Sequence, residues 1–335
     1  MDVLSDVLKA IRLTGSVFFV ADLYEPWSIS SPSLEMLQHH MGKKVESISL
    51  FHIVTEGSCT FKTENGDPFV VRQGSLIIFP NSHEHVMGST LDCSPVPVVR
   101  LLTPEALEGK SPLKHGGTGK KAQFICGYLL CDQRFNPLLG ALPEVMVLSP
   151  DLKENAGQIW PHEVFRIEID SWLYASLNQL VKEVLERRSG STTIITRLTE
   201  VMYIEALRQY MNALPENSGG WLAAVRDPEI GRALKLLHAN PGKKWSVEQL
   251  ADEVGVSRSA FARRFTELIG ESPMHYLTSW RMQLAKSLLD DHQLSLALVA
   301  EKIGYDSDVA FSRAFQRHVG MPPARWRKSN EQMGE

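Results

Sequence analysis

The sequence predicts an α+β fold: a small N-terminal β-barrel, a helical connector and a C-terminal all-α domain. Two patterns predict it. Short runs rich in Val, Ile and Phe, separated by turn residues, occupy much of residues 1–170, and such runs are typical of a small barrel or sandwich. Further along the chain, apolar residues recur at helical spacing. At 335 residues the chain is long enough for about two domains.

Four apolar runs define the predicted strands of the N-terminal domain. They are residues 47–61, 69–79, 86–102 and 122–130. The Asn65-Gly66 pair between the first two predicts a hairpin, because this dipeptide adopts the positive φ angles of a tight turn. Residues 103–121 are rich in Gly, Pro and Lys and predict a loop.

Residues 171–213 predict a connector of two amphipathic helices. One apolar stripe runs from Leu173 to Val184 and another from Ile194 to Leu207. These helices can pack on the barrel or pair with a second chain. The residues that follow, 214–223, contain a cluster of Pro, Gly and polar residues and predict a linker.

The last predicted domain, residues 224–328, contains an internal repeat. Residues 246–255 match 295–304 at an offset of 49, and residues 257–276 match 307–326 at an offset of 50. Each copy has a capping serine, an apolar stripe, a glycine and a second capping serine. These are the signals of a helix, a tight turn and a second helix.

Both copies, 246–268 and 295–319, therefore predict a helix-turn-helix motif. The second helix of such a motif enters the major groove of DNA. Between the copies, residues 272–289 predict a helix of about 27 Å. A rod of this length can hold two recognition helices near successive major-groove segments of one DNA duplex.

The outward faces of the predicted recognition helices carry small residues and arginines, whereas a solvated face usually mixes Glu and Lys at four-residue spacing. Arg263 and Arg313 occupy equivalent places, and each can form two hydrogen bonds to guanine O6 and N7. The alternative, that they only keep the surface soluble, does not explain the repeated position. The predicted DNA-binding residues are Arg258, Ser259, Ala262, Arg263, Thr266, Asp308, Val309, Ser312, Arg313, Gln316 and Arg317.

Residues 245–326 resemble the DNA-binding domain of the AraC/XylS family of bacterial transcription regulators. The segment 300–323, AEKIGYDS followed by FSRAFQRHVGMPP, is similar to the signature of that family. The resemblance implies a sequence-specific regulator that binds double-stranded promoter or operator DNA, works with RNA polymerase and forms a homodimer through the connector. Family members often carry a longer polar residue in place of Ala262, so the first half-site is expected to be read less fully.

Two N-terminal segments resemble the conserved blocks of a cupin barrel. They are FHIVTEG at 51–57 and RQGSLIIFPNSHEH at 72–85. Residues 124–143 are also similar to a subgroup of AraC-type regulators. The resemblance implies a cupin-like sensor domain that responds to a small molecule, a metal or an oxidant.

The rival interpretation is a metal-dependent cupin oxygenase or isomerase with a helical appendage. Catalytic cupins hold their metal with three histidines and a glutamate, but residues 46–50 contain no histidine. The candidate ligands that remain are His52, His83 and His85, a set that suits zinc, copper or iron. The structural alternative is that these imidazoles pack or form hydrogen bonds inside the barrel. A metal ion is therefore one hypothesis, no cofactor is certain, and we expect no enzyme activity.

Two other signals stay open. Cys93 and Cys131 are the candidate oxidant-sensing thiols, whereas Cys59 and Cys126 lie in strand-like runs that predict small core residues. The second alternative is a small apolar or aromatic ligand inside the barrel. Its predicted walls include Phe51, Ile53, Phe61, Phe69 and Phe79.

Charge and hydropathy agree with a regulator outside membranes. The net charge is −4, but residues 221–335 carry +2 and the remainder −6, so the predicted DNA-binding end is the basic part of an acidic protein. The longest apolar runs, such as residues 17–21, are far shorter than the roughly 20 residues of a membrane span. The first residues lack the pattern of a signal peptide. We therefore expect a cytoplasmic protein with no membrane partner.

Overall fold

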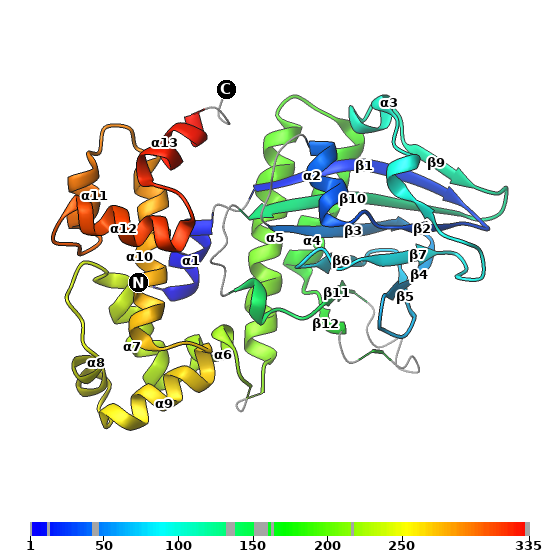
Figure 1. Cartoon of the computed structure of the whole chain (residues 1–335). Coiled ribbons are helices and arrows are strands. Elements are labelled where there is room, and N and C mark those ends of the chain that lie inside the picture. Colours follow the sequence, from blue (N-terminus) through cyan, green and yellow to red (C-terminus); the bar gives the residue numbers. More distant parts are fainter. Residues whose placement is uncertain are drawn as a thin grey trace. The chain divides into compact units, whose positions relative to one another are not determined.

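The contacts within the chain divide it into two compact units. The computed structural model describes residues 2–11, 14–41, 47–131, 138–150, 160–161, 164–215 and 218–331. The sheet unit comprises Arg12–Arg134 and Leu142–Ala213, and the helical unit comprises Met1–Ile11, Phe135–Ala141 and Leu214–Glu335. Figure 1 shows the elements of both. The sequence assigned residues 1–170 to one domain, whereas in the structure the first eleven residues group with the helical unit.

Two sheets form the sheet unit. Its strands are β1 (Thr14–Tyr24), β2 (Ser28–Ser30), β3 (Ser47–Glu56), β4 (Ser58–Thr63), β5 (Phe69–Arg72), β6 (Leu76–Phe79), β7 (His85–Gly88), β8 (Val96–Pro97), β9 (Leu113–Gly116), β10 (Lys121–Cys131), β11 (Val145–Ser149) and β12 (Val164–Glu168). The first sheet has the order β12-β11-β6-β3-β10-β1-β9 and the second the order β5-β4-β7-β2-β8. The turn at Asn65-Gly66 is confirmed, because β4 and β5 pair antiparallel with Phe61 opposite Phe69.

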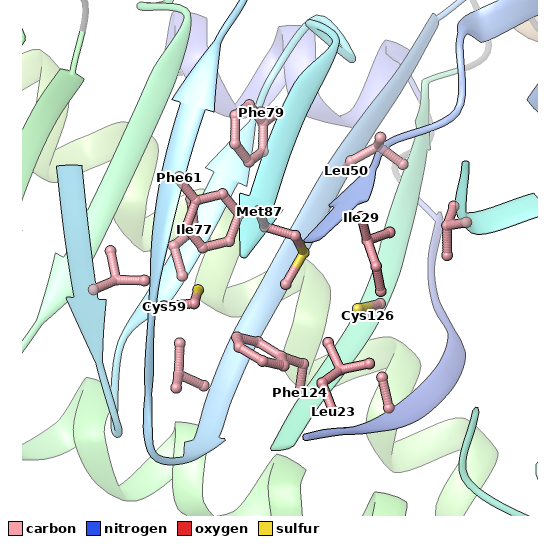
Figure 2. Packing of buried hydrophobic residues seen from close by; sticks show 14 of the residues in the cluster. Leu23, Ile29, Leu50, Cys59, Phe61, Ile77, Phe79, Met87, Phe124 and Cys126 are labelled. Atoms are coloured by element: carbon pink, nitrogen blue, oxygen red, sulfur yellow. The ribbon is translucent and has the colours of Figure 1, made fainter. Parts of the chain in front are cut away.

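The core lies between the two sheets. The ring centroid of Phe61 in β4 is 6.0 Å from that of Phe79 in β6, across the space that Figure 2 shows. The predicted α+β fold is confirmed, but the sheets of the cupin-like unit are not closed into a barrel. Among the described strands none of one sheet pairs with a strand of the other, so the two sheets face each other as open layers.

Residues 103–121, predicted as a loop, contain two short elements. Helix α3 (Pro104–Leu107) begins after Thr103, whose side chain accepts a hydrogen bond from the Ala106 N–H, and β9 pairs parallel with β1. The predicted strand 86–102 is divided: β7 covers its first residues, β8 forms only Val96–Pro97, and a 3₁₀ turn, Val98–Arg100, follows β8. The apolar pattern predicted strand structure in this segment, but not the residues at which the strands are interrupted.

Two long helices cover the outer face of the first sheet. They are α4 (Ser171–Glu186) and α5 (Ser191–Ala213), as the connector pattern predicted; a shorter helix, α2 (Leu34–Met41), belongs to the same unit. Helix α5 packs on β1, and Gly15 allows the close approach, since a Cβ atom there would lie 2.8 Å from the Thr199 side chain. Successive β3 side chains alternate: Phe51 and Ile53 point towards α4 and α5, and His52 points into the core between the sheets.

The helical unit contains both copies of the repeat. Its helices are α1 (Val3–Ile11), α6 (Trp221–Arg226), α7 (Pro228–Ala239), α8 (Val247–Val254), α9 (Arg258–Ile269), α10 (Pro273–Leu289), α11 (Leu296–Lys302), α12 (Asp308–Val319) and α13 (Pro323–Glu331). The predicted capping box is present, with Ser246 and Gln249 bonded to each other's backbone N–H. None of the described helices is long and apolar enough to cross a membrane.

Helix α1 has no counterpart in the sequence-based prediction. It packs on α7 and α10 and buries Val3, Leu4 and Val7. Gln283 of α10 donates a hydrogen bond of 3.3 Å to the backbone oxygen of Ala10 at the end of α1. The first helix of the chain is therefore part of the core of the helical unit.

Candidate functional site

The two predicted recognition helices, α9 and α12, are built alike. Ser257 and Ser307 cap them by accepting hydrogen bonds from the N–H groups of Ala260 and Ala310. In the first motif the turn contains Gly255, whose φ of 83° favours glycine. Paired phenylalanines such as Phe261 fix the inward face of each helix. The opposite face is consequently left for solvent or a ligand.

The outward face agrees with the residues chosen from the sequence. Nine of the eleven predicted DNA-binding side chains are exposed, and Ala262 and Ser312 are half-buried. Arg263 forms an ion pair with Glu267 at 3.8 Å, but both side chains are mostly exposed, so this pair is weak and easily exchanged. The arginine remains available to an incoming partner.

Arg264, the next residue, has a different environment that the sequence did not predict. Its Nε donates a hydrogen bond of 3.0 Å to Asp227 Oδ2, and this bond and the charge of Asp227 raise the pKa of the guanidinium. Asp227 also caps α7 through the Ile230 N–H at 2.9 Å. The pair therefore fixes the recognition helix α9 to the start of α7.

A buried hydrogen-bond network holds the spacer helix α10. Trp221 Nε1 donates to the hydroxyl of Tyr276 at 3.0 Å, and that hydroxyl lies 2.8 Å from His238 Nε2. Burial lowers the pKa of His238 to about 3, so the ring is neutral and can accept from Tyr276. Together with Trp280, stacked on His238 at 4.0 Å, these residues make α10 a rigid brace.

The sheet unit holds a second candidate site, an apolar cavity between its sheets. The cavity has a volume of about 50 Å³ that the centres of water molecules can occupy. This is room for roughly four water molecules. Its wall is mostly apolar and contains a polar cluster formed by His52, His85 and Cys126. The other lining residues are Phe18, Phe19, Ala21, Leu23, Ile29, Ser30, Ser31, Pro32, Leu37, Leu50, Met87, Val98, Val99, Leu102 and Gly127.

The side chains of His52, His85 and Cys126 form one hydrogen-bonded series. His52 Nδ1 lies 3.1 Å from Cys126 Sγ, and the Nε2 atoms of His52 and His85 are 2.9 Å apart. His85 Nδ1 is 2.9 Å from the backbone oxygen of His83. Burial lowers the pKa of His85 to about 4 and that of His52 well below its ordinary value, so both rings are neutral.

Comparison with known proteins identifies both units. A family model described as Cupin matches residues 2–212, and a helix-turn-helix domain model matches residues 250–329. A putative AraC-like transcription regulator of Streptomyces lividans is 31% identical over 280 residues, which are 83% of this chain and 86% of that protein. The chain belongs to the AraC-like transcription regulators. It is a DNA-binding regulator with a cupin domain, as the resemblance implied.

Further relatives of this AraC-like regulator match along its whole length. The HTH-type transcriptional regulator AlkR of Acinetobacter baylyi is 27% identical over 98% of this chain and 100% of its own. Among solved structures, the DNA-binding domain of AdpA in complex with a target DNA is 32% identical, covers 32% of this chain and 96% of that chain, and has a TM-score of 0.30. The names of the relatives support a regulator over the rival cupin enzyme.

In the AraC-like regulator the imidazole rings of His52, His83 and His85 do not face one common point, so they do not form the predicted metal site. His52 and His85 use their facing nitrogens to bond each other, and His83 contributes its backbone oxygen. Its ring is absent from the cavity wall. In the part of the chain that the structure describes, no group of three or more His, Cys, Asp or Glu side chains could hold a metal ion. The residues present therefore do not fit the metal that the cupin resemblance suggested.

The described cysteines lie in different surroundings. Cys59 and Cys126 are buried, as expected, but the strand-like pattern around Cys126 did not predict its contact with an imidazole. Cys93 is half-buried, with its Sγ 4.0 Å from the Thr90 backbone oxygen. The side chain of Cys131 lies outside the described residues.

The predicted walls of the cavity are wrong. Phe51 and Ile53 point to the other face of the first sheet, where they line a small void under α4 and α5. The remaining three predicted residues, Phe61, Phe69 and Phe79, are buried in the core but do not line the cavity. The apolar composition predicted which residues are buried, but it did not predict which of them line the cavity.

Proposed function

We propose that this regulator reads operator DNA through α9 and α12 and changes that binding when a small uncharged molecule occupies the cavity of the sheet unit. The observation that supports an effector is the cavity itself, a largely apolar space between the two sheets. A packed interior has few voids larger than a water molecule. A site for a small ligand gives this space a function.

Three exposed positions carry the proposed base reading. Arg263 and Arg313 lie at equivalent places on α9 and α12 and suit guanine. Val309 is 56% exposed at the start of α12, which is unusual for an apolar residue and suits the methyl group of thymine. The half-buried Ala262 and Ser312 are small enough to let each helix approach the groove.

The chemistry of the cavity wall limits the effector. The imidazoles are neutral and already bonded to each other, so they offer no free charge to an ion. The remaining lining is almost entirely apolar, and moving a charged group into such a space without a partner is costly. The effector is therefore a small uncharged molecule.

We also propose that α5 forms the homodimer contact. Its outer face carries Ile194 and Val201, which are 40% and 43% exposed, with the half-buried Leu198 between them. This spacing of four and three residues is that of a helix-pairing seam. If two α5 helices cross antiparallel at Val201, Arg197 of each faces Glu205 of the second copy. Opposite charges at these places favour that pairing. The further proposal of RNA polymerase as a partner is supported by the family resemblance alone.

A cavity-filling variant tests the effector. Ala21 is buried and lines the cavity, and Ala21→Met places three more side-chain atoms there. With 2-butanone as the probe, we expect the wild-type protein to gain thermal stability and to change its affinity for operator DNA, and Ala21→Met to do neither. Ala175→Met, on the exposed face of α4, is the matched control. Equal responses of wild type and Ala21→Met would contradict the cavity as the effector site.

A further inference from the structure

The proton positions in the cavity series follow from its last acceptor. The His83 carbonyl can only accept, so His85 Nδ1 carries a hydrogen and its Nε2 is a free acceptor. His52 Nε2 must then donate to His85, which leaves His52 Nδ1 as an acceptor. Cys126 therefore donates its S–H to His52 Nδ1 at 3.1 Å. Each hydrogen-bonding proton of the series is therefore assigned to one atom.

We propose that Cys126 captures small uncharged electrophiles covalently, with His52 as the proton acceptor. The inference rests on the proposed effector cavity and names the class of molecule that enters it. A nucleophile bonded to a base, with the base held by a third group, is the arrangement that activates side-chain nucleophiles. Here His85 is the third group, and it holds the ring of His52 in the required tautomer.

The burial of the Cys126 thiol and the size of the cavity limit which reagents can react with it. Burial raises the pKa of Cys126 and lowers the pKa of His52, so the resting pair is a neutral thiol and a neutral imidazole. The proton leaves sulfur only as the new bond forms. Charged reagents are excluded by the apolar wall, and the volume of about 50 Å³ admits only small molecules without rearrangement.

An α,β-unsaturated ketone illustrates the balanced step. The sulfur of Cys126 forms a bond to the β-carbon while the carbon–carbon double bond opens, and the S–H proton moves to His52 Nδ1. That proton then passes to the α-carbon of the enolate. The product is a thioether with no atom lost, and the step needs no oxidant or reductant. His52 returns to neutral but has lost the hydrogen bond from the thiol.

The adduct occupies a position from which it can act on the connector. Cys126 lies in β10, between β1 and β3, and α5 packs on β1. An added group on Cys126 fills the cavity and presses against the neighbouring side chains of these strands. The strain would reach the proposed dimer helix through β1.

Cys59 of the same chain serves as an internal comparison, although it does not line the cavity. Cys59 is as deeply buried as Cys126, at 3% and 5% exposed, and both point into the core between the sheets (Figure 2). Burial raises the pKa of Cys59 as well, but no imidazole contact accompanies it in the described structure. With methyl vinyl ketone at neutral pH and peptide mass spectrometry, we expect Cys126 to be alkylated at least about tenfold faster than Cys59. Equal rates, or an unmodified Cys126, would overturn the inference.

A variant isolates the proton acceptor. His52→Gln keeps a polar side chain and removes the base, and we expect it to slow alkylation of Cys126 by about tenfold or more. The rate at Cys93, which is half-buried and distant from this series in sequence, should stay unchanged and so report an intact fold. If Cys126 reacts equally fast in folded His52→Gln protein, His52 is not the acceptor.

The saturated analogue 2-butanone separates this inference from the proposed function. It is nearly the same size as methyl vinyl ketone but cannot be added to a thiol in this way. If 2-butanone binds and changes operator affinity while methyl vinyl ketone leaves Cys126 unmodified, covalent capture is wrong and the effector cavity stands. If neither compound affects the wild-type protein, both proposals fail.

Discussion

Arg263 and Arg264 are adjacent in sequence but have different surroundings. Arg263 forms an exposed ion pair with Glu267 on its own helix, whereas Arg264 donates a hydrogen bond to Asp227, 37 residues away. Helical periodicity predicted the outward direction of Arg263, because that direction depends only on positions within one helix. It could not predict Arg264 or Cys126, whose partners belong to distant elements. The sequence thus predicted which way a helical side chain points, but not which distant side chain it contacts.

The first prediction concerns the two base-reading arginines. Arg263→Ala and Arg313→Ala should each weaken specific operator binding by about 1–3 kcal/mol and relax base preference at one position. Gel shifts at fixed salt measure this. Arg100→Ala, which removes an exposed basic side chain of the sheet unit, should leave binding unchanged. Unaltered affinity in both recognition-helix variants would rule out the roles assigned to them.

The helices were predicted better than the sheets. Caps and glycine stops are local signals, and Ser246 and Gly255 marked α8 within a residue of its ends. Sheet closure depends on which distant strands pair, and periodicity of single strands does not contain that information. The sequence therefore predicted a cupin-like domain of short strands with the right hairpin at Asn65-Gly66, but not that its two sheets stay open. The cavity, which depends on packing of both sheets, was mislocated for the same reason.

The second prediction concerns the outer face of α5. Val201→Glu should weaken self-association at least about tenfold, because it places two carboxylates at the proposed two-fold axis. Arg197→Glu should weaken it as well, and Arg197→Glu combined with Glu205→Arg should restore much of the loss. Sedimentation analysis of all the variants measures the change. A double variant no better than the single one would exclude the antiparallel pairing.

Both units of the molecule contain histidines that stay neutral when folded. Burial lowers the pKa of His85 to about 4 in the sheet unit and that of His238 to about 3 in the helical unit. An unfolded histidine has a pKa of about 6.5. Below that pH the unfolded chain binds protons that the folded chain cannot, so protonation favours unfolding.

The third prediction follows from this difference. The free energy of unfolding should be insensitive to these histidines above about pH 6.5 and should fall as the pH decreases towards 4. Each histidine contributes a slope of up to about 1.4 kcal/mol per pH unit. Urea titrations at several pH values between 7.5 and 5 measure it. A free energy that stays constant or rises over this range would show that the imidazoles are not buried and neutral.

The placement of α1 has a practical consequence for dissecting the protein. Val3, Leu4 and Val7 are buried in the helical unit, although more than two hundred residues separate them from α7 in the chain. A fragment that starts at residue 214 would expose the apolar surface that they cover and is expected to aggregate. Adding a synthetic peptide of residues 1–11 should return such a fragment to solution, because the peptide covers that apolar surface again.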